Sequence, residues 1–122
     1  MIDHVTLRVG DFGASRQFYT EALAPLGYEV LHEYPSALGM GRDGKPDFWI
    51  ASADYLTAGT HVAFAADQRT AVDAFYRSAI QAGGKDNGAP GVREEYHPQY
   101  YGAFVFDPDG NNIEAVFHKA EP

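Results

Sequence analysis

Short runs of alternating apolar and polar residues recur along the chain, and their spacing predicts strands and two helices. His4–Val9 has apolar side chains at every second position, as expected for a half-buried strand. Asp11 can cap a helix after it, because apolar residues then recur at helical spacing until Pro25 and Gly27. Three further strands are predicted in this part of the chain, at Tyr28–Tyr34, Ala37–Gly41 and Phe48–Ala51.

The same order of elements begins again in the second half of the chain. His61–Ala66 has strand character, and Asp67 can cap a second helix. Apolar side chains again follow a helical spacing, until Gly83 and Gly84 end the helix. The segment 85–99 is rich in glycine and proline, so we expect it to be irregular.

A single sequence offset relates the two halves. A shift of 57 residues (61 − 4) places His4 on His61, and the same shift places Gly27 on Gly84. An offset that holds through a strand, a helix and a helix stop indicates an internal duplication. The sequence therefore predicts one domain of two copies, about 1–56 and 57–122, each with a strand, a helix and three strands.

The second copy is expected to end in a β-hairpin that carries a charged residue. Asp107–Gly110 has proline and glycine where a tight turn requires them, and apolar runs flank it. Glu114 lies inside the second apolar run, Ile113–Phe117. An unpaired buried carboxylate costs about 3 kcal/mol or more, so Glu114 must either face water or have a positive partner.

Composition excludes several classes of protein. The 122 residues carry a net charge of −8 without a cluster of lysine and arginine, which argues against nucleic acids and anionic membranes as partners. The absence of cysteine excludes disulfides, thiolate nucleophiles and cysteine-based zinc sites. Neither a signal peptide nor a membrane-spanning apolar run of about 20 residues is present, so we expect a cytoplasmic protein.

Three residues stand out as candidate metal ligands. His4 and His61 occupy equivalent places in the two copies, and Glu114 is the carboxylate inside the last strand. Two imidazoles and one carboxylate suit a divalent first-row metal and leave coordination positions open for substrate or water. The alternative is that both histidines are hydrogen-bonded strand residues and that Glu114 faces solvent.

Three stretches resemble the vicinal oxygen chelate superfamily, which includes glyoxalase I, fosfomycin-resistance proteins, extradiol dioxygenases and bleomycin-resistance proteins. They are Asp3-His4-Val5, Thr60-His61-Val62 and the segment Asp107–Glu114. The resemblance implies an α+β fold of two βαβββ modules whose mixed sheets curl around a cavity. It also implies a divalent iron, manganese, nickel, cobalt or zinc ion held by His4, His61 and Glu114.

The resemblance further implies a homodimer and limits which activities of the superfamily fit this sequence. Members of this length usually dimerise and share their sites, so His4 is expected from one subunit, and His61 and Glu114 from the other. Glyoxalase I has a fourth, carboxylate ligand, and matching the two turns puts Phe48 opposite Glu114, followed by Trp49 and Ile50. None of these residues binds metal, which argues against glyoxalase I activity and favours members with three ligands.

Other residues are candidates for substrate binding and catalysis. The candidate catalytic groups are Glu114, His97 and Tyr101, and Tyr96 and Tyr100 can orient a substrate oxygen. Arg8 lies on the same strand face as His4 and can contact an anionic substrate; Trp49 is a candidate cavity wall. The alternative for these residues is an ordinary surface or core role.

Two functions remain open at this stage. The first is a metal-dependent enzyme of lyase, isomerase, transferase or dioxygenase type that chelates two neighbouring oxygens of a small substrate. The second is a metal-free protein of the bleomycin-resistance type that sequesters a small molecule. The acidic charge and the aromatic residues would suit a planar, cationic ligand in that case.

Overall fold

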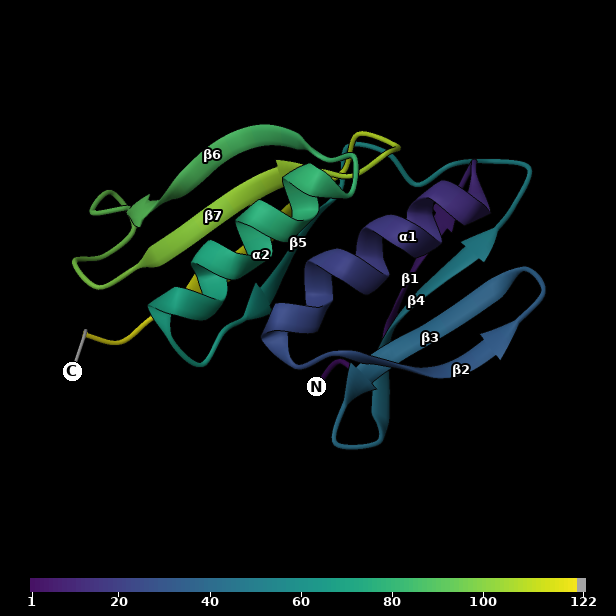
Figure 1. The fold of residues 1–122 in the computed structure, drawn as a ribbon, viewed down its shortest axis with the longest axis horizontal. Helices are drawn as coiled ribbons and strands as arrows, with labels where there is room; N and C mark the ends of the chain where they lie inside the picture. Colours follow the sequence, from purple (N-terminus) through teal and green to yellow (C-terminus); the bar gives the residue numbers. More distant parts are fainter. Residues whose placement is uncertain (121–122) are drawn as a thin grey trace.

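The computed structural model describes residues 1–120 as two similar halves, each with a four-stranded sheet and one long helix (Figure 1). The first half contains β1 (Val5–Val9), α1 (Phe12–Leu23), the 3₁₀ helix η1 (Ala24–Leu26), β2 (Glu29–Tyr34), β3 (Ala37–Arg42) and β4 (Lys45–Ser52). The second contains β5 (His61–Ala65), α2 (Arg69–Gln81), β6 (Lys85–Val92), β7 (Tyr101–Phe106) and β8 (Asn112–Phe117). Within residues 1–120, no helix has the length and apolarity required to cross a bilayer.

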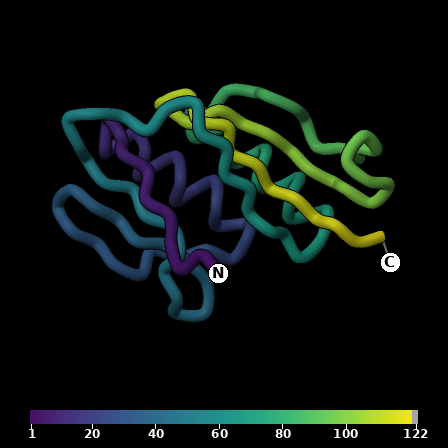
Figure 2. Tube along the Cα trace, turned by 180° about the vertical axis from the view of Figure 1, so that it is seen from behind, coloured from purple at the N-terminus to yellow at the C-terminus, as the bar shows by residue number. Residues whose placement is uncertain are grey.

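The sheets repeat one topology, in agreement with the predicted α+β fold of two βαβββ modules. Their strand orders are β1-β4-β3-β2 and β5-β8-β7-β6, with the first strand of each half parallel to its last. The helices lie together on one side of the sheets, and the strands lie in front when the molecule is viewed from behind (Figures 1 and 2). We call the sheet surface away from the helices the open face.

The beginning of each helix tests the predicted caps. Asp11 caps α1 as predicted, since its Oδ1 accepts a hydrogen bond of 3.0 Å from the Ala14 amide. The prediction for Asp67 is wrong, because Gln68 is the N-cap residue of α2 and makes no side-chain cap. Asp67 instead accepts a hydrogen bond of 2.9 Å from Arg42, which links the two halves.

The segment after α2 is more regular than its composition predicts. Residues 85–99 were expected to be irregular, but Lys85–Val92 forms β6 and pairs antiparallel with β7. Register shifts on both sides of Gly88 absorb the glycine- and proline-rich sequence. Only residues 93–100 connect β6 to β7, whereas residues 35–36 connect the equivalent strands of the first half. The second half therefore has an inserted loop.

The strand register corrects one sequence match. Thr6 pairs with Trp49 in the first sheet, and Ala63 pairs with Glu114 in the second. Because Thr6 and Ala63 are 57 residues apart, Trp49 and not Phe48 is the counterpart of Glu114. Phe48 is buried in the core, so Trp49 and Glu114 lie on the open faces.

A buried hydrogen-bond network fixes the turn before β8. The Asp107 carboxylate accepts bonds from the backbone amides of Asp109 and Asn111 and from the Tyr19 hydroxyl of α1. Gly110 completes the turn at φ +87°, a value that glycine adopts without strain. This network ties the β7–β8 hairpin of the second half to the helix of the first half.

Candidate functional site

Glu114 is fully buried in β8, and both of its carboxylate oxygens have partners. His61 Nε2 lies 2.7 Å from Oε1, and the Tyr100 hydroxyl donates a hydrogen bond to Oε2. The His61 side chain is 52% exposed, so one side of this cluster opens to solvent. Glu114 was expected either to face water or to have a partner. The structure shows burial with partners.

Strand register and a small residue create this geometry. His61 pairs with Asn112 on β8, which makes it the diagonal neighbour of Glu114 on the open face. Gly102 leaves room for Tyr100: a Cβ at this position would lie 3.1 Å from the Tyr100 ring and 3.2 Å from Glu114 Oε2. A side chain at position 102 would therefore press on the contact between Tyr100 and Glu114.

The environment keeps Tyr100 in its donor form. Burial raises the pKa of the Tyr100 hydroxyl well above its usual value, and the hydrogen bond to the Glu114 carboxylate and its negative charge raise this pKa further. A carboxylate oxygen accepts, so His61 Nε2 carries the hydrogen that lies between it and Oε1. When that hydrogen leaves, an imidazole nitrogen and a carboxylate oxygen are adjacent. This is a suitable donor pair for a divalent cation.

His4 does not join this pair within one chain. Its Nδ1 lies 2.8 Å from the Asp3 carboxylate and lowers the pKa of Asp3. Over residues 1–120, no group of three histidine, cysteine or acidic side chains is positioned to hold a metal. His4 and Arg8 lie on the open face of the first sheet, because the residues between and after them, Leu7 and Val9, are buried in the core.

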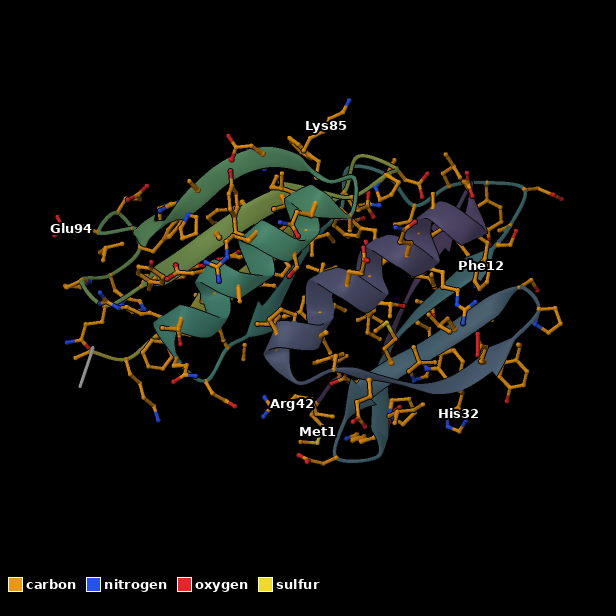
Figure 3. All side chains as sticks on the ribbon, viewed as in Figure 1. Met1, Phe12, His32, Arg42, Lys85 and Glu94 are labelled. Carbon is orange, nitrogen blue, oxygen red and sulfur yellow. The ribbon has the colours of Figure 1, made fainter. Side chains whose placement is uncertain are left out.

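The open face of the first sheet carries aromatic rings where the second has Glu114. Trp49 lies across Gly39, whose position has no room for a Cβ because it would be 2.7 Å from the indole. The rings of His32 and Tyr34 lie 5.8 and 6.5 Å from Trp49, with nearly parallel planes. Figure 3 shows His32 on β2 and Glu94 in the inserted loop at opposite ends of the molecule.

The hydrogen bonds of the His97 and Tyr101 side chains go to partners other than Glu114 and His61. His97 Nδ1 accepts the Gln99 amide, so its Nε2 donates to His118 Nδ1 at 3.0 Å. Tyr101 lies on the helix face, where its hydroxyl donates to Asp73 of α2. This placement argues against the predicted catalytic role of Tyr101. Successive strand residues point to opposite faces, so Tyr100, and not Tyr101, lies on the side of Glu114.

Sequence reasoning missed Arg93 in the inserted loop. Its guanidinium lies over the Phe104 ring, 5.4 Å from the centroid, and Phe104 is the direct cross-strand neighbour of Glu114. Tyr96, a predicted substrate-binding residue, packs on the Tyr100 ring at a centroid distance of 4.7 Å. The sequence could have indicated Arg93, because this arginine lies in a loop that the first copy lacks.

The fold and the sequence identify the family. Residues 1–115 match the model of the Glyoxalase/Bleomycin resistance protein/Dioxygenase superfamily. The chain therefore belongs to this superfamily, as the His4, His61 and Glu114 motifs suggested. Among curated proteins, no match was found.

Solved structures of the same family have the same fold. A glyoxalase/bleomycin resistance protein from Albidiferax ferrireducens T118 is 30% identical, with a TM-score of 0.83 over 96% of this chain and 98% of that chain. A glyoxalase/bleomycin resistance protein/dioxygenase family enzyme from Burkholderia phytofirmans PsJN is 21% identical, with a TM-score of 0.74 over 97% and 98%. A glyoxalase-related enzyme from Fulvimarina pelagi is 21% identical, with a TM-score of 0.69 over 96% and 87%.

Proposed function

We propose that the chain is a metal-dependent enzyme that binds two neighbouring oxygens of a small substrate. The observation that carries the proposal is the contact of 2.7 Å between His61 Nε2 and the fully buried Glu114 Oε1. This contact brings a neutral-nitrogen donor and a carboxylate donor together on an open sheet face. Divalent iron, manganese, nickel, cobalt and zinc all accept such a donor pair.

The third ligand in this proposal is the partner's His4. The chain does not bring its own His4 to His61 and Glu114, although all three lie in places that match the superfamily's ligand positions. The two sheets present separate open faces, one with His4, Arg8 and Trp49 and the other with His61 and Glu114. A homodimer that apposes unlike faces would complete the set in each of two equivalent sites.

The chain's own residues then have distinct roles. Tyr100 holds Oε2 of Glu114, which orients Oε1 toward His61. Trp49 and Arg8 would contact the substrate from the partner's sheet, with the indole as an apolar wall. A bound divalent metal would supply Lewis-acid stabilisation of negative charge that develops on a substrate oxygen. The reaction is of lyase, isomerase, transferase or dioxygenase type, and His97 and Tyr101 have no part in the proposal.

Metal analysis tests this proposal. Untagged protein purified without chelator should contain divalent metal in equimolar amount or take it up on addition of nickel, manganese, zinc or iron. His61→Ala should weaken the binding of this metal by more than about tenfold, because it removes a ligand rather than an outer-shell group. His32→Ala removes an exposed histidine of the first sheet and is the matched control. Full metal content in His61→Ala would eliminate this site.

A metal-free sequestering protein is the second candidate, and the first sheet favours it. The nearly parallel rings of Trp49, His32 and Tyr34 form an aromatic surface where a second carboxylate ligand would otherwise stand. Such a surface suits a planar cationic ligand, as does the net charge of −8. Protein that cannot be loaded with any of the four metals would favour this function over the enzyme.

A further inference from the structure

A small hollow beside the Glu114 cluster is lined mainly by polar groups. The lining residues are Asn87, Gly88, Arg93, Tyr96, Phe104 and Asn112. Phe104 pairs with Glu114, and Asn112 pairs with His61, so the hollow adjoins both proposed ligands. A substrate bound at His61 and Glu114 would therefore extend into it.

Arg93 gives the hollow a positive charge, and no ion pair within residues 1–120 includes its guanidinium. Its Nη2 donates to the Ala89 carbonyl at 2.7 Å, and the guanidinium stacks over Phe104. Within residues 1–120, none of the ion pairs involves Arg93, although acidic residues outnumber basic ones by 17 to 9 in the sequence. The remaining N–H groups of the guanidinium fork are available to an anion.

The neighbouring amides and phenol add further donors. Asn87 Nδ2 donates to Asn112 Oδ1 at 3.1 Å, which leaves the Asn112 amide N–H groups unused by that bond. Tyr96 also lines the hollow, and its ring packs on the Tyr100 ring at a centroid distance of 4.7 Å.

We infer that this hollow binds a compact anionic group, a carboxylate or a phosphoryl group, of the substrate that occupies the proposed site. The inference rests on the proposed function for its account of the rest of the substrate. Anion binding itself can be measured separately. The overall charge of −8 would repel free anions from the surface in general, so specific binding requires a local positive group such as Arg93.

Titration of the full chain with inorganic phosphate, and separately with acetate, tests the inference. Backbone amide shifts of Gly88 and Gly91 in ¹⁵N-labelled protein report on the hollow. Saturable shifts are expected with at least one anion, and the tighter anion identifies the class. Arg93→Gln should weaken binding about tenfold or more through loss of charged hydrogen bonds, and Arg93→Lys should restore part of it. Arg77→Gln, which removes an exposed arginine of α2, should bind as the wild type does.

Two results would overturn the inference. One is the absence of saturable shifts in the wild-type chain, and the other is equal binding by the wild type and Arg93→Gln. His61→Ala separates this inference from the proposed function, because its anion binding should persist while its metal is lost. Anion binding that disappears in His61→Ala and persists in Arg93→Gln would place the anion on the metal instead. Metal uptake by Arg93→Gln should equal that of the wild type.

Discussion

Glu114 is a carboxylate in a position where the strand pattern requires an apolar residue. Its full burial is offset by His61 and by Tyr100, so that neither oxygen lacks a partner. Ala63, which pairs with Glu114 on β5, and Gly102, two residues along β7 from its partner Phe104, are small and leave space for the imidazole and the phenol. At the scale of the residue, the site is therefore a buried acid oriented by two donors.

Replacement of Tyr100 tests this orientation. Tyr100→Phe keeps the ring and removes the hydroxyl, so Glu114 Oε2 loses its donor in a buried position. We expect a loss of unfolding free energy of about 1–3 kcal/mol. We also expect metal affinity to fall about tenfold, because outer-shell partners orient metal ligands. Chemical denaturation and metal titration measure the two effects.

Tyr55→Phe is the matched control, since Tyr55 is exposed in the segment between the two halves. It should change neither stability nor metal affinity. A Tyr100→Phe protein with wild-type metal affinity would show that the phenol packs beside Glu114 without positioning it.

The β7–β8 hairpin is the element that determines the position of Glu114 along the sheet and its strand register. Its turn is fixed by bonds to Asp107, and Asp109 lies nearby, where its Oδ2 accepts a hydrogen bond of 3.4 Å from the amide of Gly10, which precedes the N-cap residue of α1. Burial raises the pKa of Asp109, the hydrogen bond from the Gly10 amide partly offsets this rise, and the negative charges of Asp107 and Asp11 add to it. The turn therefore contains an acid that is less stable ionised in the folded chain than in the unfolded chain.

This raised pKa predicts a pH-dependent effect of Asp109→Asn. Above the pKa of Asp109 in the folded chain, this acid is ionised in both states, and its ionised form destabilises the folded state. Below its pKa in the unfolded chain, about 4, Asp109 is protonated in both states and this destabilisation is absent. Asp109→Asn should therefore be more stable than the wild type at pH 7. The difference should shrink as the pH falls toward about 4.

Urea unfolding at a series of pH values measures this difference. Asp54→Asn removes an exposed carboxylate from the segment between the halves and should show no such trend. A stability difference for Asp109→Asn that does not change with pH would mean that the turn does not disfavour the ionised acid.

At the scale of the whole molecule, the duplicated halves have diverged in complementary ways. The first sheet carries His4 and an aromatic surface around Trp49, whereas the second carries His61, Glu114 and the inserted loop with Arg93. Among the described residues 1–120, neither open face has a complete set of metal ligands by itself. We therefore place the proposed site between two copies of the chain, with unlike faces together.

Complementation between two inactive variants tests this arrangement. In a mixed dimer of His4→Ala and His61→Ala chains, one site retains the intact His4 of one chain with the intact His61 and Glu114 of the other. The second site lacks both histidines. A mixed dimer purified through two cleavable tags should therefore recover half of the wild-type metal, while each variant alone recovers little.

Metal content is measured by elemental analysis, and assembly by sedimentation. A mixed dimer that remains without metal would show that the site is not shared between chains. A wild-type chain that sediments as a monomer at micromolar concentration would contradict the arrangement directly.

Much of the fold follows from the sequence, because the relevant signals are local. Apolar periodicity located both helices and most strands, and the offset of 57 residues predicted the duplication. The Asp11 cap and the Asp107–Gly110 turn are built mainly from bonds between residues close in sequence, so both predictions hold. Strand β6 was missed because its glycines and proline weaken the periodic pattern, and only pairing with β7 makes this segment a strand.

The sequence by itself predicted the two modules and the three candidate ligands from spacing along the chain, and it indicated the family through the resemblance of three short motifs. Only the tertiary structure decided which ligands meet. Strand register brought His61 to Glu114 and placed Trp49 rather than Phe48 in the equivalent position. It also turned Tyr100 toward the site and Tyr101 away, because adjacent strand residues face opposite sides. Such pairings join residues far apart in sequence, and local pattern carries no record of them.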